Sequence, residues 1–384
     1  MPATAKLYET DPYVQTFTAT VLVCTPAGEQ FAVQLDRTAF YPEGGGQPCD
    51  TGALGTALVT DVQEHGGVIT HTVSAALPVG QTVEGRIDWA RRRDHMEQHT
   101  GEHILSGTLH RLFGAENVGF HIGSPAVRMD MSVPLTAGQL AEAEAQANAV
   151  IRADAPVRCW YPAPEDLAKL TYRSKKEIEG PVRIIDAAGA DLCACCGTHV
   201  ARCAEVGAVK ILSAQNYKGG TRLSVVCGMR ALRDYTLKCE NASRISTLLS
   251  AKVNEIAPAV EHLQDEADAL KARVARLETE LFESRARQMA GAEHPVVFED
   301  DLRPDSLRRL SCALSGVCPG VCAAFSGSDE TGYSYALFEK DGDVSECNRA
   351  MNKALNGRGG GRGEVAQGTV HATRAQIEAY FQSI

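Results

Sequence analysis

The chain has 384 residues, 44% of them hydrophobic and 22% charged, with a formal net charge of −10. These values are typical of a soluble protein of two or three domains, and no apolar run approaches the roughly 18 residues that a membrane span needs. The N-terminal residues lack the apolar stretch of a secretory signal, so we expect a cytoplasmic protein without a membrane partner. The negative charge argues against a general polyanion binder, but local basic patches can still act alone.

Residues 1–88 are expected to form a small β-barrel. FTATVLVCT, EQFAVQLD, GGVITHTV and QTVEGRID are short runs rich in β-branched residues, separated by Gly, Pro and Asp. Several such strands at short spacing are typical of a barrel. Asp88 is a suitable N-cap for a helix over about 89–113, and Gly114 follows its expected end.

Residues 89–228 are expected to form an α/β domain. After the first helix, strands and helices alternate, with a helix predicted near 136–153 and strands at PVRIIDAA and GAVKILSA. Two basic patches fall in this domain, one at residues 91–93 and one at Arg173, Lys175 and Lys176. Such patches are more often solvated surface than binding sites.

Residues 229–291 are expected to form a helical, coiled-coil linker. Apolar residues recur there at alternating spacings of four and three, which is the seam of a left-handed coiled coil. Such a seam implies a partner helix, either from a second chain or folded back, and Pro258 should kink or divide the run. The alternative is one long amphipathic helix on its own domain. The seam comprises Leu249, Val253, Ile256, Val260, Leu263, Ala267, Leu270, Val274, Leu277 and Leu281.

Residues 292–384 read as a last α/β unit. HPVVFED, GVCAAFSG and YSYALFEK predict strands, and helices are expected near 304–315, 346–355 and 373–383. The segment GRGGGRGE at 357–364 is typical of a mobile loop, although its glycine amides and the flanking Arg358 and Arg362 would suit phosphate.

Two short stretches carry the chemistry, HTGEH at 99–103 and CCGTH at 195–199. His99 and His103 lie four residues apart on the expected helix, so both imidazoles can reach one ion. A second segment must then complete a tetrahedral site, and Cys195 and His199 offer a thiolate and an imidazole around a glycine. This set suits zinc better than magnesium or calcium.

Two other uses of these residues remain open. HTGEH also fits the zinc-peptidase pattern H-x-x-E-H, in which Glu102 would be the general base. The chain has 13 cysteines without an export signal, which favours metal ligation over disulfides. A separate zinc knot is therefore the second alternative, although its cysteines are not arranged in the C-x₂₋₄-C pairs that are usual for such sites. Its ligands would be Cys193, Cys195, Cys196 and Cys203.

Four motifs in order resemble the alanyl-tRNA editing proteins, which are free-standing relatives of the editing half of alanyl-tRNA synthetase. They are FYPEGGGQPCDTG (40–52), DWARRRDHMEQHTGEHILS (88–106), LCACCGTHV (192–200) and GRGGGRGEVAQG (357–368), and together they span nearly the whole chain. The resemblance implies an α+β, multidomain fold. It consists of a small β-barrel with a Gly-rich motif (1–88), an α/β zinc editing domain (89–228), a coiled-coil linker (229–291) and a C-terminal α/β domain of the DHH-associated type (292–384).

The same resemblance implies an aminoacyl-tRNA ester hydrolase that deacylates tRNA(Ala) mischarged with serine, or sometimes glycine. One Zn²⁺ per chain would be held by His99, His103, Cys195 and His199. Two positions depart from the family pattern. Cys196 stands where relatives often have glycine, and Glu102 stands where synthetases commonly have threonine.

Further roles follow as expectations. Glu102 is the candidate catalytic residue. Alternatively, it is a hydrogen-bond partner of a ligand histidine. Since no synthetase catalytic core is expected, the chain should remove an amino acid from tRNA rather than attach one. The expected partners are tRNA(Ala) and a second copy, joined through the coiled coil or the C-terminal domain. A zinc peptidase and a non-catalytic tRNA-binding protein with structural zinc are the alternatives. Expected substrate contacts are Glu43, Gly44, Gly45, Gly46, Gln47, Thr100 and His121, and expected tRNA contacts are Arg91, Arg92, Arg93, Arg358 and Arg362.

Overall fold

The computed structural model describes residues 3–174 and 180–384, so Lys175 and Lys176 of the second basic patch lie outside the described residues. The chain divides into two compact units, residues 1–242 and residues 243–384. Among the described residues, no helix has the length and apolar character to span a membrane.

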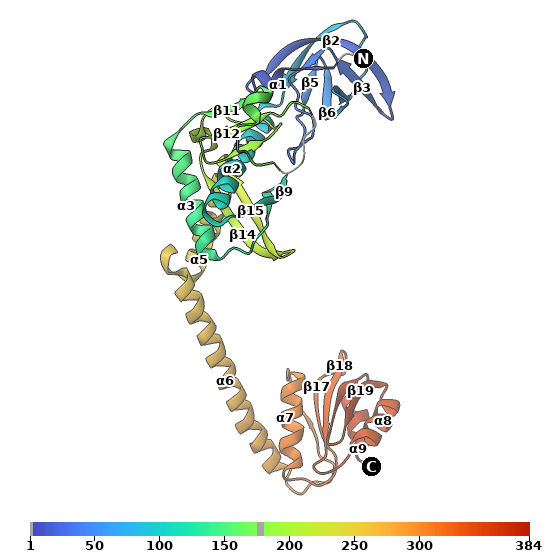
Figure 1. Ribbon diagram of the computed structural model, residues 1–384. Helices are drawn as coiled ribbons and strands as arrows, with labels where there is room; N and C mark the ends of the chain where they lie inside the picture. The colour runs from blue at the N-terminus through green and yellow to red at the C-terminus, as the bar shows by residue number, and fades with distance from the viewer. Residues whose placement is uncertain (1–2, 175–179) are drawn as a thin grey trace. The chain divides into compact units, whose positions relative to one another are not determined.

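The first unit begins with a closed barrel of six strands (Figure 1). Inward and outward residues alternate along its strands, as along β8, where Val83, Gly85 and Ile87 are buried. A short helix α1 (Leu7–Thr10) follows β1 (Ala5–Lys6), which pairs with β4 (Arg37–Thr38). The barrel order is β2 (Thr16–Ala27), β3 (Gln30–Leu35), β7 (Val68–Val73), β6 (Ala57–His65), β5 (Gly52–Leu54) and β8 (Thr82–Ile87).

Helix α2 (Trp89–Phe113) is the central element of the first unit, and most of its residues are buried. Contacts of the flanking residues set both ends of this helix, as predicted. The Asp88 side chain accepts a hydrogen bond from the Arg91 amide, and Gly114 adopts the left-handed conformation that ends the helix. Helix α3 (Ala137–Ala153) packs beside α2 and begins at a capping box of Thr136 and Gln139 (Figure 1).

Two sheets complete the first unit. A four-stranded antiparallel sheet packs one face against α2, where Met129 and Leu223 join Ile104 and Leu105 in the core. A three-stranded sheet and the short helices α4 (Pro164–Leu167) and η1 (Cys203–Val206) lie between α3 and β14 in the sequence. The larger sheet has the order β14 (Val209–Tyr217), β15 (Gly220–Cys227), β10 (Val127–Met131) and β9 (Asn117–Ile122). The smaller comprises β11 (Val157–Trp160), β12 (Ile184–Ala187) and β13 (Leu192–Ala194).

The second unit contains a five-stranded sheet with helices on both faces. Phe282 of α6 and Leu310 of α7 lie in one core, and Met351 of α8 and Ile377 of α9 lie in the other. The strand order is β16 (Val296–Phe298), β17 (Cys322–Ser328), β18 (Gly332–Phe338), β20 (Val365–Val370) and β19 (Gly357–Arg362), and only β16 and β17 are parallel. The helices are α6 (Ile256–Gln288), α7 (Pro304–Ser315), α8 (Ser345–Ala354) and α9 (Arg374–Phe381).

The predicted helical run through the linker is divided before Pro258. Helix α5 (Gly228–Leu249) ends first, and the short helix η2 (Val253–Glu255) precedes α6. Pro258 then lies in the first turn of α6, where its missing N–H has no carbonyl to bond. Six of the seam side chains on α6 are 46–61% exposed, namely Val260, Leu263, Leu270, Val274, Leu277 and Leu281.

The glycine-rich segment is an edge strand rather than the expected mobile loop. Gly357 to Arg362 form β19, which pairs in antiparallel register with β20. Tyr335 explains this use of glycine, because a Cβ at Gly359 or Gly368 would clash with its hydroxyl. The glycines therefore permit a close backbone approach, and they lack the side chains from which a strand is usually predicted.

Candidate metal centre

The two stretches singled out in the sequence meet in the first unit. His99 and His103 come from consecutive turns of α2, while Cys195 and His199 come from the segment that follows β13. One ligand atom from each of these four residues lies within 4.8 Å of every other. The three histidines are buried and the cysteine is partly buried, so the group is enclosed by protein.

Two of the imidazoles are oriented by hydrogen bonds on their outer nitrogens. Nδ1 of His99 lies 2.8 Å from Oε1 of Gln47, and Nδ1 of His199 lies 3.3 Å from Oγ1 of Thr100. Their Nε2 atoms lie 3.5 and 3.4 Å from Sγ of Cys195. The bonds to Nδ1 therefore leave both Nε2 atoms directed at the same thiol.

His103 is oriented by a carboxylate that was not predicted. Its Nδ1 lies 2.7 Å from Oδ2 of Asp191. Arg173 donates to both oxygens of Asp191, each at 2.8 Å. Burial alone would raise the pKa of Asp191, but the hydrogen bonds from His103 and Arg173 outweigh it and lower that pKa to about 2. Asp191 is thus an ionised group that fixes the His103 ring.

These residues fit a bound metal ion. Nε2 of His103 is buried and has no hydrogen-bond partner among the residues that the structure describes. Burial would raise the pKa of the Cys195 thiol, but the imidazoles of His99 and His199 outweigh it and hold that pKa well below its usual value. Three imidazole nitrogens and one thiolate are the donor set that a tetrahedral zinc ion prefers.

The glycine-rich loop of the barrel reaches this group through Gln47. Besides contacting His99, the Gln47 side chain donates to Oγ1 of Thr198 at 2.9 Å and accepts from the Thr198 amide. Gly46 has a φ of +85°, and a Cβ there would lie 2.5 Å from the carbonyl oxygen of Phe120. A Cβ at Gly197 would likewise strike the His99 ring. Glycine at both positions lets the barrel loop and the cysteine segment close around the histidines.

The remaining members of the predicted loop lie in more open positions. Gly44 and Gly45 form the turn that leads to Gln47, and the Tyr41 hydroxyl donates to the Gly44 carbonyl at 3.0 Å. The exposed Glu43 accepts a hydrogen bond from Gln63 at 3.3 Å, which directs its carboxylate along the barrel.

Glu102 and Thr100 lie beside the candidate ligands. Glu102 is buried, accepts a hydrogen bond from Asn117 of β9, and has Oε2 at 4.0 Å from Nε2 of His103. The hydroxyl of the fully buried Thr100 contacts His199 and accepts from the Val200 amide. These contacts orient the His199 ring.

His121, an expected substrate contact, does not face the metal group. It is exposed on β9, whereas the preceding Phe120 has its ring centroid 5.0 Å from that of His99. Because neighbouring residues of a strand face opposite sides, His121 points to the other face of the sheet.

The first basic patch is largely engaged within the protein. Arg92 is fully buried and forms an ion pair with the equally buried Asp50, so the expectation that it contacts tRNA is wrong. Arg93 pairs with Glu97 and Glu205. Nε of the partly buried Arg91 donates to the carbonyl of Cys49. Arg358 and Arg362, by contrast, are exposed on β19 of the second unit.

The alternative four-cysteine knot does not assemble. Cys193 forms a second possible metal group with His103 and Asp191. Cys196 is exposed, while Cys203 is buried in the apolar core. Among the described residues, neither of these two belongs to a group of potential metal ligands.

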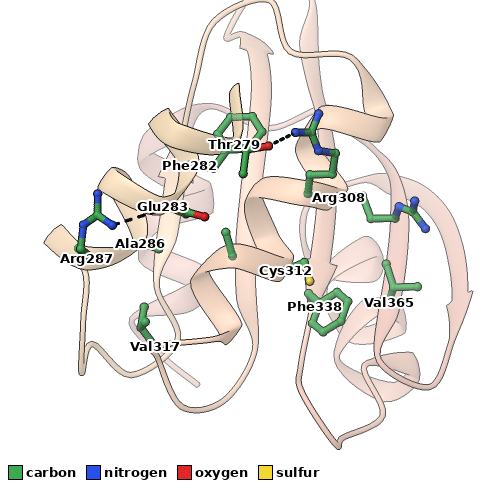
Figure 2. Close-up of a pocket in the computed structure, with 12 residues that line it drawn as sticks. Thr279, Phe282, Glu283, Ala286, Arg287, Arg308, Cys312, Val317, Phe338 and Val365 are labelled. Carbon is green, nitrogen blue, oxygen red and sulfur yellow. Dashed lines mark hydrogen bonds and ion pairs between the residues drawn. The ribbon is translucent and has the colours of Figure 1, made fainter. Parts of the chain in front are cut away.

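A cavity of about 600 Å³ lies within the second unit (Figure 2). Phe282 and Ala286 of α6, Cys312 of α7 and Phe338 of β18 contribute to its walls, and Arg308 lies at its margin. None of the predicted site residues lines it.

Asp191 and Arg173 are the site residues that the sequence reasoning missed. Asp191 lies four residues before Cys195 and belongs to no predicted motif, while Arg173, twenty-two residues before Cys195, was predicted only as part of the second basic patch. Their role depends on a contact with His103, which is distant in sequence, so no local signal was available.

Two family models match parts of the chain. Residues 14–91 match the class II (A) tRNA synthetases, and residues 182–224 match the second additional domain of threonyl and alanyl tRNA synthetases. The second match includes Cys195 and His199. The match to a solved C-Ala domain of Aquifex aeolicus alanyl-tRNA synthetase covers 24% of this chain and 92% of that domain, at 23% identity and with a TM-score of 0.20.

Similar proteins extend over most of the chain. It is 31% identical to the alanine–tRNA ligase of Pyrococcus furiosus, covering 99% of this chain but 43% of the ligase. The alanyl-tRNA editing protein AlaX-L of Pyrococcus horikoshii is 27% identical, covering 97% of this chain and 96% of that protein. The alanyl-tRNA editing protein Aarsd1 of Mus musculus is 31% identical, covering 70% of this chain and 69% of that protein. With this identity, this coverage and the ordered motifs around its candidate metal centre, the chain belongs to the alanyl-tRNA editing proteins.

Proposed function

We propose that this chain is a cytoplasmic hydrolase that deacylates mischarged tRNA(Ala), with Ser-tRNA(Ala) and also Gly-tRNA(Ala) as substrates. The observation that carries the proposal is the convergence of His99, His103, Cys195 and His199 within 4.8 Å. The barrel loop reaches the same group through Gln47, whose side chain contacts His99. Membership of the editing family supplies the substrate class.

One Zn²⁺ per chain is the proposed cofactor, with those four residues as its ligands. When bound, zinc would act as a Lewis acid that either lowers the pKa of water or accepts the lone pair of the neutral amino group of the substrate. Gln47, Asp191 and Thr100 would keep the three imidazoles in their ligating orientation, since each contacts an Nδ1 atom.

The reaction is hydrolysis of the ester that joins the aminoacyl group to the terminal ribose. Water adds to the ester carbonyl, the bond from that carbon to the ribose oxygen breaks, and a free amino acid and tRNA result. Glu102 is the proposed general base, because its Oε2 lies 4.0 Å from Nε2 of His103 at the edge of the centre. The loop of Glu43 and Gly44 to Gln47 would contact the aminoacyl end.

Four segments would divide this work. Residues 1–88 contribute the loop, residues 89–228 the metal centre, residues 229–291 a helical linker, and residues 292–384 a domain of the DHH-associated type. Arg91, Arg93, Arg358 and Arg362 are proposed tRNA contacts. A homodimer is proposed through the exposed apolar seam of α6, the C-terminal domain, or both, because a coiled-coil seam is normally covered by a partner helix.

Two other functions make different predictions. A zinc peptidase would use His99, Glu102 and His103, and it leaves the presence of Cys195 and His199 in the same group unexplained. A non-catalytic tRNA-binding protein is favoured by one observation, namely that four protein ligands are typical of a closed structural zinc site.

The test is to incubate the purified chain with labelled Ser-tRNA(Ala), Ala-tRNA(Ala) and casein. We expect rapid release of serine, little release of alanine and no casein cleavage. His103→Ala should abolish serine release, whereas His110→Ala, which changes a partly exposed histidine of the same helix, should retain it. Casein cleavage would support the peptidase, and RNA binding without serine release would support the binding protein.

A further inference from the structure

Within the part of the chain that the structure describes, the helices that contact the four-stranded sheet of the first unit, α2 and α3, pack on one of its faces. Met129, Leu223 and Val225 face α2 and are buried. Of the residues that alternate with them, Arg128, Ser213 and Gln215 are exposed and Arg222 and Ser224 are partly exposed, while Val226 near the end of β15 is buried. Figure 1 shows α2 and α3 on the same side of β14 and β15.

The strand register joins the outward residues into continuous rows. Arg128 of β10 lies opposite His121 of β9 and Ser224 of β15. In the next row, Arg222 of β15 lies opposite both Asp130 of β10 and Gln215 of β14. Since the side chains of directly opposed residues are close neighbours, these rows form one polar surface. We call it the open sheet face, defined by His121, Arg128, Tyr217, Lys218 and Arg222.

The open sheet face is basic, although the whole chain carries a net charge of −10. Arg128 has no ion-pair partner among the described residues, and the exposed Lys218 lies in the turn between β14 and β15 with a φ of +49°. Arg222 is paired with Asp130 through Nε at 2.6 Å and Nη2 at 2.8 Å. Arg128, Lys218 and Arg222 carry three positive charges. Asp130 carries one negative charge, so two positive charges remain available to a polyanion.

The face also offers a stacking surface. The Arg222 guanidinium lies 3.5 Å from the ring centroid of Tyr217, while Asp130 holds its other edge. An aromatic–guanidinium pair of this kind suits a sugar or an unpaired base beside a phosphate chain.

Strand β9 links the open sheet face to the metal centre. Phe120 packs on His99 from one side of the strand, and the next residue, His121, belongs to the open sheet face. The amide of Ile122 donates to the Gly46 carbonyl at 2.8 Å, so the strand also contacts the barrel loop. Strand β9 is thus the edge strand of the sheet and has the open sheet face on one side and the candidate centre on the other.

We propose that the open sheet face binds the sugar–phosphate backbone of the acceptor end of the substrate tRNA. The identity of the RNA rests on the proposed function, whereas the charge, the stacking pair and the link through β9 come from the described residues. Arg128 and Lys218 contact phosphates, and the Tyr217–Arg222 pair lies beside the sugars. This surface differs from the tRNA contacts expected at residues 91–93, of which Arg92 is buried and Arg93 is paired with acids.

The test uses an uncharged RNA hairpin that copies the acceptor stem of tRNA(Ala) and ends in CCA. Its affinity for the full chain is measured by fluorescence anisotropy at several salt concentrations. The double variant Arg128→Ala/Lys218→Ala should bind about tenfold more weakly, and its plot of log affinity against log salt should be shallower by about two. The control Arg152→Ala removes an exposed charge from α3. It should change the affinity by no more than about twofold and the slope of the salt plot by no more than about one. Equal affinity of the double variant and the parent chain, or an equal loss in the control, overturns the proposal.

A kinetic arm separates this inference from the proposed function. If the parent chain hydrolyses Ser-tRNA(Ala), the double variant should show a raised KM, and an unchanged KM overturns the open sheet face as a tRNA surface. If the parent chain releases no serine but its RNA affinity still depends on Arg128 and Lys218, the proposed hydrolysis fails and the surface stands.

Discussion

Nδ1 of His103 lies 2.7 Å from Oδ2 of Asp191, and Arg173 holds both oxygens of that carboxylate. A charged hydrogen bond of this kind fixes the ring of a ligating histidine and increases its basicity. Asp191→Asn should therefore lower zinc affinity by about 10- to 100-fold while leaving the fold intact. Competition with a coloured chelator measures the change. Asp166→Asn, at an exposed position of α4, is the control, and equal zinc affinity of the two variants would contradict the role of Asp191.

Gln47 of the barrel loop contacts a second candidate ligand, His99. Gln47→Ala removes the bonds to His99 and Thr198, so we expect a loss of serine release of about tenfold or more, with the far-ultraviolet circular dichroism unchanged. Gln63→Ala on the barrel surface should have little effect, because its side chain hydrogen-bonds to Glu43 and Asp61 and not to the metal group. Retention of full activity in Gln47→Ala would show that the barrel loop does not support the centre.

The buried Arg92–Asp50 pair leads to a prediction about stability rather than RNA binding. Arg92 also donates to the carbonyls of Pro12 and Ala39, so Arg92→Ala leaves a buried carboxylate and two acceptors without their donor. We expect the free energy of unfolding to fall by about 3–5 kcal/mol, as measured by urea titration. Arg91→Ala should cost much less, because it removes one bond to the Cys49 carbonyl. Weaker RNA binding by Arg92→Ala at unchanged stability would restore Arg92 as a tRNA contact.

His71 should make the first unit less stable in mild acid. It is fully buried in the barrel, and burial lowers its pKa to about 4, whereas the unfolded chain has the ordinary value of 6.5. Between those pH values the unfolded state binds the extra proton, so the free energy of unfolding falls as the pH drops from 6.5 to 4. The expected contribution of His71 is about 3 kcal/mol.

The check is urea unfolding at several pH values, followed by tryptophan fluorescence, since Trp89 and Trp160 both lie in the first unit. His71→Gln should lose less stability than the parent chain over this range, whereas His65→Gln, at an exposed position of β6, should follow the parent. Identical pH dependence in all three proteins would mean that His71 is not buried in its neutral form.

Local signals account for what the sequence predicted well. Asp88 and Gly114 set the ends of α2 through contacts within one turn, so its bounds could be predicted from the neighbouring residues. The spacing of His99 and His103 placed both rings on one face of that helix. The order of the motifs then connected the helix to Cys195 and His199.

Contacts between distant segments account for what was missed. Residues 91–93 look like a surface patch, yet Arg92 turns inward to meet Asp50, forty-two residues earlier. His121 faces away from the centre because strand alternation sends Phe120 toward it. The strand β19 has no β-branched residues and depends on its pairing with β20, so only the tertiary structure identifies it.

Two adjacent cysteines allow the most direct test of the central claim, that His99, His103, Cys195 and His199 together hold one zinc ion on which deacylation depends. Metal content and release of serine from Ser-tRNA(Ala) are measured in parallel for Cys195→Ala and Cys196→Ala. Cys195→Ala should lose both the bound zinc and the release of serine, whereas Cys196→Ala, at an exposed position outside the group, should keep about one zinc per chain and its activity. Full zinc content and full activity in Cys195→Ala would contradict the account.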